Sequence, residues 1–247
     1  MKGGKKPDLV KSKVNYQLMG NNSWQHADSL AELNSDYQRF YLSNEKGKDS
    51  YLLSKQMAKD VGSLKQTVDL ADRATSTNTD SYYWPIIKDE LTDPTGFTFT
   101  SFPFEQDTSV HGSFSGEIKV KINKKDFDLG MTFYQLTAEG KYFELLYYIG
   151  RASYAKDPSN RQLLTPGKVE TIPFKDTRMT GKLFKKGSRL VVVLNVNKNE
   201  MAQVNFGTGK DVSDENITDG KVPLEVEWLN SSFVNVPMKI LNQKNRS

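Results

Sequence analysis

The fold is decided by one stretch of sequence, Phe184-Lys185-Lys186-Gly187-Ser188-Arg189-Leu190-Val191-Val192-Val193-Leu194-Asn195-Val196. Residues 190–194 are all apolar and mostly β-branched, so both faces of a strand here are expected to be covered, as at the centre of a packed sheet. Gly187 precedes the run and lets the backbone turn sharply where a Cβ would be strained. The stretch therefore predicts a turn that leads into a buried central strand.

Strand patterns recur on both sides of this stretch. Ile118, Val120 and Ile122 alternate with lysines, which is typical of a half-exposed strand. Residues 128–135 and 142–152 flank a hairpin signal at 137–141, and residues 224–228 alternate again. Helix-period patterns are few and marginal, at 54–61 and 63–71. We therefore expect a mostly-β, antiparallel β-sandwich of the jelly-roll, galactose-binding-like kind, with few short helices.

Composition narrows the class of protein. The 247 residues carry a formal net charge of +4, but both signs are scattered, which argues against a nucleic-acid-binding surface. The absence of cysteine excludes disulfides, thiolate nucleophiles and zinc–sulfur sites. No apolar run approaches the ~20 residues of a membrane span, and no signal-peptide core follows the basic N-terminus. We expect a cytoplasmic chain without cofactor, metal, membrane or nucleic-acid partner.

Short motifs, taken in order, resemble a known family. They are Met19-Gly20 followed by Trp24, Val110-His111-Gly112, Asp126-Phe127-Asp128, Gly150-Arg151-Ala152-Ser153-Tyr154, Pro166-Gly167, and Phe184 with Gly187 and Arg189-Leu190. Their order and spacing resemble the C-terminal domain of X-prolyl dipeptidyl peptidases and cocaine-esterase-like (CocE/NonD) serine hydrolases, from about Val14 to Ile240. One departure is Ser188, where the family usually has His.

The resemblance implies a domain organisation and a function. Residues 1–13, polar and Gly/Pro-containing, are expected to be a linker from a preceding α/β-hydrolase domain, with the jelly-roll domain over 14–247. The whole protein would cleave an amide or ester by Ser-His-Asp catalysis. This chain would be its non-catalytic part, buttressing the catalytic domain, helping to wall the substrate pocket, and forming homo-oligomers in some cases.

Catalytic signatures are absent from the sequence. The Gly-x-Ser-x-Gly elbow of such hydrolases does not occur, and its nearest match, His111-Gly112-Ser113-Phe114-Ser115-Gly116, has serines at the wrong offsets. We interpret that match as a turn between strands and His111 as a turn residue. His26 is expected at the surface or at a domain interface. We therefore assign no catalytic residue, although an atypical enzyme that uses His26 or His111 stays an alternative.

Acidic and glycine-rich segments receive structural interpretations. Asp126 and Asp128 are expected to face solvent or pair with lysines. Residues 207–210 lack the spacing of a phosphate loop and are predicted to form a turn. A solvated loop is favoured over a calcium cage for four further acids, Asp211, Asp214, Glu215 and Asp219.

Aromatic residues supply the only candidate contact sites. Tyr82, Tyr83 and Trp84 form a cluster, and Trp24 is expected in the turn that follows the first strand. Such rings dominate interface energetics, so these four residues are candidates for a domain interface or a substrate rim. Two other readings stay open for the cluster: membership of the domain's own core, and stacking on sugar in a carbohydrate-binding module.

Overall fold

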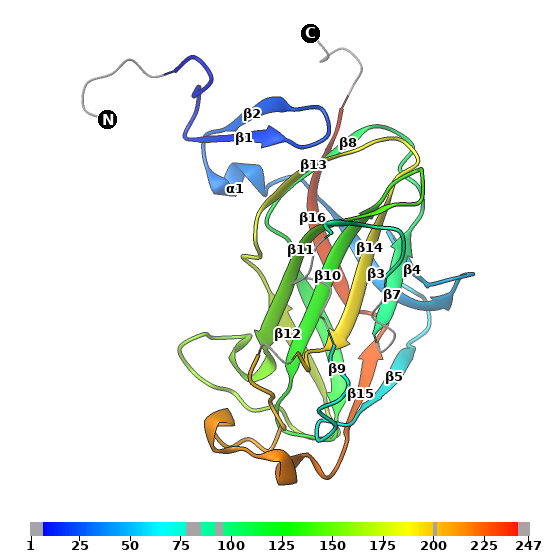
Figure 1. The fold of residues 1–247 in the computed structure, drawn as a ribbon, viewed down its shortest axis with the longest axis vertical. Helices are drawn as coiled ribbons and strands as arrows, with labels where there is room; N and C mark the ends of the chain where they lie inside the picture. Colours follow the sequence, from blue (N-terminus) through cyan, green and yellow to red (C-terminus); the bar gives the residue numbers. More distant parts are fainter. Residues whose placement is uncertain (1–6, 78–84, 92–95, 200–201, 242–247) are drawn as a thin grey trace, which may run out of the picture.

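The predicted central strand is confirmed in the computed structural model, which describes residues 7–77, 85–91, 96–199 and 202–241 (Figure 1). Gly187 has a φ of 89°, and strand β14 (Arg189–Val196) follows at once. Leu190, Val192 and Leu194 point into the main hydrophobic core, whereas Val191 and Val193 belong to a second, smaller cluster. Both faces of β14 are therefore covered.

The chain is nearly all β, and most of its other strands lie with β14 in two layers. The strands before β14 are β1 (Val14–Leu18), β2 (Ser23–Ala27), β3 (Tyr37–Lys46), β4 (Tyr51–Ser54), β5 (Ser63–Val68), β6 (Ile87–Lys88), β7 (Phe97–Ser101), β8 (Thr108–Gly112), β9 (Ser115–Ile122), β10 (Asp128–Leu136), β11 (Tyr142–Arg151), β12 (Val169–Phe174) and β13 (Thr180–Phe184). After β14 come β15 (Leu224–Leu229) and β16 (Phe233–Ile240). The helical segments are α1 (Leu30–Leu33) and the 3-10 turns η2 (Ala152–Tyr154), η3 (Val212–Asp214) and η4 (Ile217–Gly220).

One long sheet, folded over on itself, makes both layers. Its strand order is β5-β15-β9-β16-β3-β4-β7-β14-β10-β11-β6, with β12 alongside β9 and β8–β13 attached to β16. The pairs within it are antiparallel except β4–β7, which is parallel. The predicted β-sandwich is thus confirmed, with one parallel pair that the sequence did not indicate.

A polar bridge crosses the core between the layers. The Gln66 side chain on β5 donates to Asn195 Oδ1 on β14 at 2.7 Å and accepts from the Trp228 indole at 3.0 Å. All three side chains are buried. A buried polar group costs free energy unless it is paired. This chain of hydrogen bonds therefore favours one alignment of the two layers over others.

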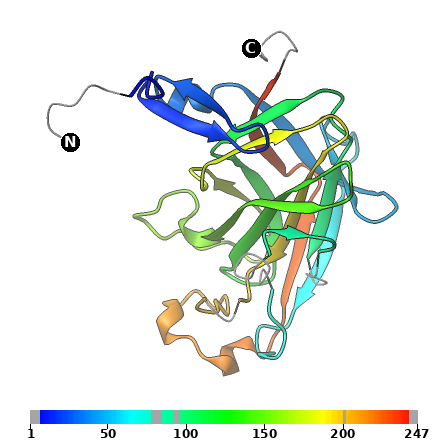
Figure 2. The ribbon, with the colours of Figure 1, turned by 45° about the horizontal axis from the view of Figure 1, so that its top comes forward.

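The first strands form a small structure of their own. Strands β1 and β2 pair only with each other as a two-stranded sheet, and α1 follows after its N-cap Ser29. We call residues 14–33 the N-terminal unit. Figures 1 and 2 both show it at one end of the sandwich, opposite the end that carries η3 and η4.

Two carboxylates at the start of β10 lie inside the protein, so the expectation that they face solvent or pair with lysines is wrong. Asp126 is 0% exposed; it accepts hydrogen bonds from Ser153 N–H and Oγ and from Arg161, at 2.7–3.1 Å. Asp128 accepts from Arg151 at 2.9 and 3.1 Å and from Asn205 at 3.0 Å. The carboxylates tie together segments that lie far apart in the sequence.

The weak helix-period patterns were also misleading. Residues 63–68 form β5, and residues 55–62 contain no helix. In β5, Gln66 and Val68 face inward while Lys65 and Thr67 are exposed, an alternation that overrides a weak helical period.

The Asp126 network gives a stability prediction. Asp126→Asn removes the charge that Arg161 and Ser153 surround, and leaves the half-buried Arg161 guanidinium without its counter-ion. We expect the free energy of unfolding to fall by about 3 kcal/mol, the usual order for breaking a buried ion pair. The measurement is urea unfolding followed by tryptophan fluorescence.

The matched control is Glu105→Gln, which makes the same charge change at an exposed position. Glu105→Gln should change the free energy of unfolding by less than about 0.5 kcal/mol. Equal effects of the two variants would show that the network adds nothing to stability.

Candidate functional site

The N-terminal unit rests on β8 and β13 through a small set of contacts. Met19 N–H donates to Gly181 C=O at 2.9 Å, and Leu183 N–H donates to Met19 C=O at 2.8 Å. The Tyr16 ring lies over Gly181, where an added Cβ would come within 3.1 Å of it. A residue with a Cβ at position 181 would therefore require the Tyr16 ring to shift by a few tenths of an ångström.

Large apolar side chains are exposed on this unit. Trp24 on β2 is 43% exposed, Leu30 on α1 is 53% exposed, and Met19 is 41% exposed. Trp24 thus lies within a strand instead of the turn predicted there, and its ring is free to contact a partner. Met19, Trp24 and Leu30 come from three successive segments of this small unit, and exposed apolar side chains that form a patch mark interaction sites.

The other sequence-predicted contact residues, Tyr82, Tyr83 and Trp84, lie outside the described residues. Their proposed roles as core, interface or sugar-stacking residues therefore stay predictions. His26 lies on β2 as a partly exposed side chain and contacts Asn15 Oδ1 at 2.7 Å. Its expected surface position is confirmed, while its role at an interface stays a prediction.

His111 is not a turn residue, because it lies in the middle of a three-stranded arrangement, on β8 between β13 and β16. Its side chain is 8% exposed, and Nδ1 lies 3.0 Å from Ser109 Oγ. The Tyr16 ring of the N-terminal unit is its aromatic neighbour, with 6.2 Å between ring centroids. Burial lowers the pKa of His111 below its ordinary 6.5, and the charge of Lys239 adds to this shift, whereas a hydrogen bond to the Ser109 backbone and the charge of Asp36 oppose it.

The Ser109–His111 pair is geometrically unsuited to nucleophilic catalysis. The two residues lie two positions apart on one strand, and both are buried. No carboxylate among the described residues is hydrogen-bonded to the imidazole. A catalytic serine needs a base that a third group orients and space for a substrate. We interpret the pair as part of the packing beneath the N-terminal unit.

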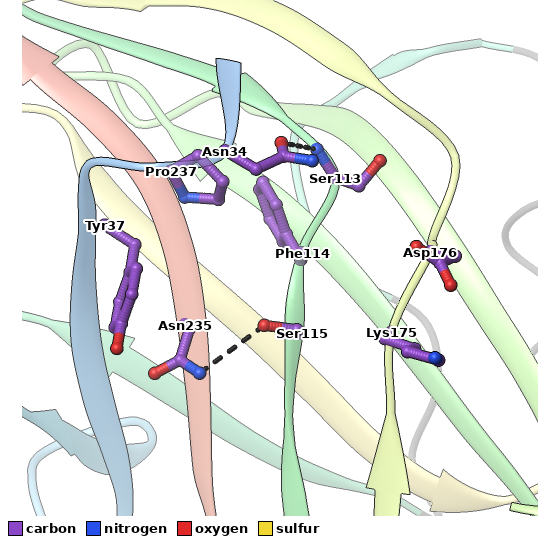
Figure 3. A pocket seen from close by; sticks show the side chains of 9 residues that line it. All are labelled: Asn34, Tyr37, Ser113, Phe114, Ser115, Lys175, Asp176, Asn235 and Pro237. Carbon is purple, nitrogen blue, oxygen red and sulfur yellow. Dashed lines mark hydrogen bonds between the residues drawn. The ribbon is translucent and has the colours of Figure 1, made fainter. Parts of the chain in front are cut away.

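A hollow with a cavity volume of about 90 Å³, open to solvent on one side, lies where β3, β16, the β8–β9 corner and the segment after β12 meet (Figure 3). Phe114, which is fully buried, forms its floor, and Ser113 and Ser115 flank that residue. Tyr37 and Pro237 lie on one side and Lys175 and Asp176 on the other. Of this set, sequence reasoning singled out only residues 113–115, as part of a false catalytic match.

Local backbone geometry builds the wall of the hollow next to α1. Asn34, the C-cap of α1, accepts a hydrogen bond from Ser113 N–H at 2.9 Å. Gly112 has a φ of 77°, and a Cβ there would lie 2.2 Å from Asn34 Oδ1. Only glycine lets the β8–β9 corner approach α1 this closely.

The acidic segment at the opposite end of the molecule is used for capping. Glu215 accepts from the backbone N–H groups of Phe206 and Thr208, at 2.7 and 2.8 Å. Asp211 is the N-cap of η3, and Asp219 completes a capping box with Asn216, the N-cap of η4; these bonds to backbone N–H groups lower the pKa of both carboxyls. Gly207 and Gly209 have φ values of 77° and 90°, which confirms the predicted turn.

Within the described ranges, no three His, Asp or Glu side chains are grouped so as to hold a metal ion. In the same part of the chain, no helix is long and apolar enough to cross a membrane.

Solved structures with the same architecture are parts of larger hydrolases. An aminopeptidase from a marine-sediment Thaumarchaeota archaeon superposes with a TM-score of 0.77 at 14% identity, covering 92% of this chain and 40% of its own. An α-amino acid ester hydrolase gives 0.70 at 15% identity, with 91% and 41% covered. A CocE/NonD family hydrolase from Staphylococcus aureus gives 0.61 at 15% identity, with 92% and 40% covered. The chain therefore spans about two fifths of the length of these structures.

The sequence itself matches a family model. Residues 10–231 match the X-Pro dipeptidyl-peptidase C-terminal non-catalytic domain, which is most of the chain. A search of curated proteins finds no match. The chain therefore belongs to the family of X-Pro dipeptidyl-peptidase C-terminal non-catalytic domains, as the sequence motifs predicted.

The buried imidazole gives a pH prediction. Because the pKa of His111 is lower in the folded protein than its ordinary 6.5, the unfolded chain binds a proton that the folded chain does not, between those two values. The contribution that neutral, buried His111 makes to the free energy of unfolding is complete above about pH 6.5. It falls with decreasing pH by up to about 1.4 kcal/mol per pH unit within the window.

The measurement is the free energy of unfolding of wild type and His111→Gln between pH 4.5 and 8. The difference between the two proteins should change with pH only below about 6.5. His26→Gln serves as control for a histidine at the surface. A difference that is constant across the range would mean that burial of His111 does not shift its titration.

Proposed function

We propose that this domain assists an acyl-transfer reaction carried out by a preceding α/β-hydrolase domain, which it buttresses and whose substrate pocket it helps to wall. Support comes from the family, which is non-catalytic and C-terminal, and from related structures in which the matched region is about two fifths of a hydrolase. The reaction would be cleavage of an amide or ester by a serine nucleophile on the partner domain.

The observation that carries the proposal is the exposed apolar surface of the N-terminal unit. A C-terminal domain is joined to the rest of its protein through its first residues, and on that basis we infer that the N-terminal unit lies close to the partner domain. Trp24, Leu30 and Met19 are exposed there. Aromatic anchors of this kind contribute most of the binding energy in protein interfaces.

Other features of the proposal rest on the sequence alone. Jelly-roll connectivity of the galactose-binding-like kind, a cytoplasmic location, the linker over residues 1–13 and homo-oligomer formation stay predictions. Trp84, through which a carbohydrate-binding module would stack on sugar, lies outside the described residues. The test of that function is a polysaccharide pull-down with Trp84→Ala.

Catalytic inertness is the first prediction. The purified chain should take up no fluorophosphonate label and should not hydrolyse p-nitrophenyl esters or X-Pro anilides, because no described serine has the geometry of an activated nucleophile. Labelling is read by intact-protein mass spectrometry. Stoichiometric labelling of any serine in this chain would overturn the assignment as a non-catalytic domain.

The docking surface gives the second prediction. Trp24→Ala should weaken binding of the chain to an α/β-hydrolase domain of this family from the same genome by at least about tenfold, the loss typical of a central aromatic anchor. Biolayer interferometry with the immobilised chain measures it. Circular dichroism checks that the variant is folded.

The control is Ile217→Ala on η4, an apolar residue of similar exposure at the far end of the molecule. It should bind as wild type does. If Ile217→Ala lost binding while Trp24→Ala bound as wild type does, the interface would lie at the η3–η4 end, which contradicts the proposal.

A further inference from the structure

One segment of the chain carries an excess of positive charge. Residues 175–189, which run from the end of β12 to the start of β14, contain six basic residues and one acidic residue. This stretch, which we call the basic segment, therefore carries more net positive charge than the +4 of the whole chain. Lys175, Arg178, Lys185 and Lys186 are exposed, so most of this charge faces solvent. An excess of this kind attracts an anionic partner and speeds its association.

Two cations of the basic segment lie over aromatic rings of β11. The Lys182 ammonium is 3.9 Å from the centre of the Phe143 ring. The central carbon of the Arg178 guanidinium is 4.4 Å from the centre of the Tyr147 ring. A ring attracts the cation without neutralising its charge, and it restricts a long side chain that would otherwise move freely. The two cations are therefore held in place, which lowers the entropy lost when a partner binds them.

Neither Arg178 nor Lys182 has a counter-ion within the part of the chain that the structure describes, where the ion pairs involve other basic residues. Burial lowers the pKa of Lys182 below its ordinary 10.5, and the charge of nearby Lys185 adds to this shift. The Lys182 ammonium is thus partly removed from water and lies in a positive environment. A carboxylate from a partner would offset both unfavourable effects, so its ion pair with Lys182 would be stronger than one between fully exposed side chains.

The basic segment adjoins the exposed apolar side chains of the N-terminal unit. Met19, which is 41% exposed, is hydrogen-bonded to both neighbours of Lys182 on β13, and Figures 1 and 2 show this strand next to the unit. In the basic segment itself, Met179 follows Arg178 and is 46% exposed. Methionine, aromatic and arginine side chains in one region are the composition of a protein interface. A surface that binds a nucleic acid depends mainly on Lys and Arg contacts to phosphates, so the apolar neighbours favour a protein partner.

From these features we propose that Arg178 and Lys182 dock onto an acidic surface of the α/β-hydrolase domain, beside the contact made by the N-terminal unit. This inference rests on the proposed function, and it adds the chemistry of the partner's surface, which places carboxylates opposite the two cations. Apolar contacts through Trp24 supply most of the affinity, whereas the cations set the orientation of the domains and the rate at which they associate. The interaction therefore weakens as salt screens the charges.

The test is biolayer interferometry of the full chain with the α/β-hydrolase domain from the same genome, at about 50 mM and about 500 mM NaCl. The double variant Arg178→Glu/Lys182→Glu should weaken binding at least about tenfold at the lower salt concentration and much less at the higher one, mainly through slower association. Arg178→Gln/Lys182→Gln removes the charges without adding repulsion and should weaken binding only about threefold. Circular dichroism and urea unfolding check that the variants are folded.

The matched control is Lys168→Glu/Lys221→Glu, which makes the same change of charge at two exposed lysines outside the basic segment. It should bind within about twofold of wild type, because the effect of a charge falls off with distance. The proposal is overturned if Arg178→Glu/Lys182→Glu binds as wild type does while Trp24→Ala weakens binding, a result that leaves the proposed function intact.

A polyanion is the alternative occupant of the basic segment, and a heparin column tests it. If Arg178→Glu/Lys182→Glu loses affinity for heparin but binds the hydrolase domain as wild type does, the basic segment is a polyanion site and the proposal is overturned. Absence of any binding between the wild-type chain and the hydrolase domain would overturn both this proposal and the proposed function. A salt-dependent loss in the Arg178/Lys182 variants, absent from the control, supports the proposal.

Discussion

The structure depends on burying both faces of β14. Leu190, Val192 and Leu194 fill the core between the two layers, and Val191 and Val193 are covered from the other side with Tyr134 and nearby residues. A strand with apolar side chains on both faces cannot lie at a surface, so the chain has to supply a layer on one side and a cover on the other. The long sheet that folds over on itself meets this requirement.

Local patterns made much of this fold predictable. The uninterrupted apolar run of β14, the alternation in β9 and β15, and the hairpin between β10 and β11 each depend on residues close together in sequence. The family followed from the same stretches, because the motifs lie at strand ends and turns. Trp24 was predicted as a contact residue and is exposed, although within a strand.

The polar interior was not predictable from such patterns. Asp126 resembles any surface carboxylate in sequence, and its burial depends on Arg161 and Ser153, which reach it only in the folded chain. His111 likewise owes its burial to β13, β16 and Tyr16. The hollow combines several separate segments, and its most exposed ring, Tyr37, carries no sequence signal that distinguishes it from other strand aromatics. Alternation in a single segment contains no information about these distant partners.

The pairing of β3 with β16 has a consequence for how the chain is made. Tyr37 to Tyr41 pair with Pro237 to Phe233, so a strand near the start of this chain completes its hydrogen bonds with β16, which is synthesised much later. Strand β5 likewise pairs with β15, which is synthesised much later. Contacts this distant slow folding, and the unpaired strand edges are open to aggregation until they close. During translation the sandwich can therefore assemble only after its C-terminal strands have left the ribosome, so truncation within β16 should be far more damaging than truncation after it.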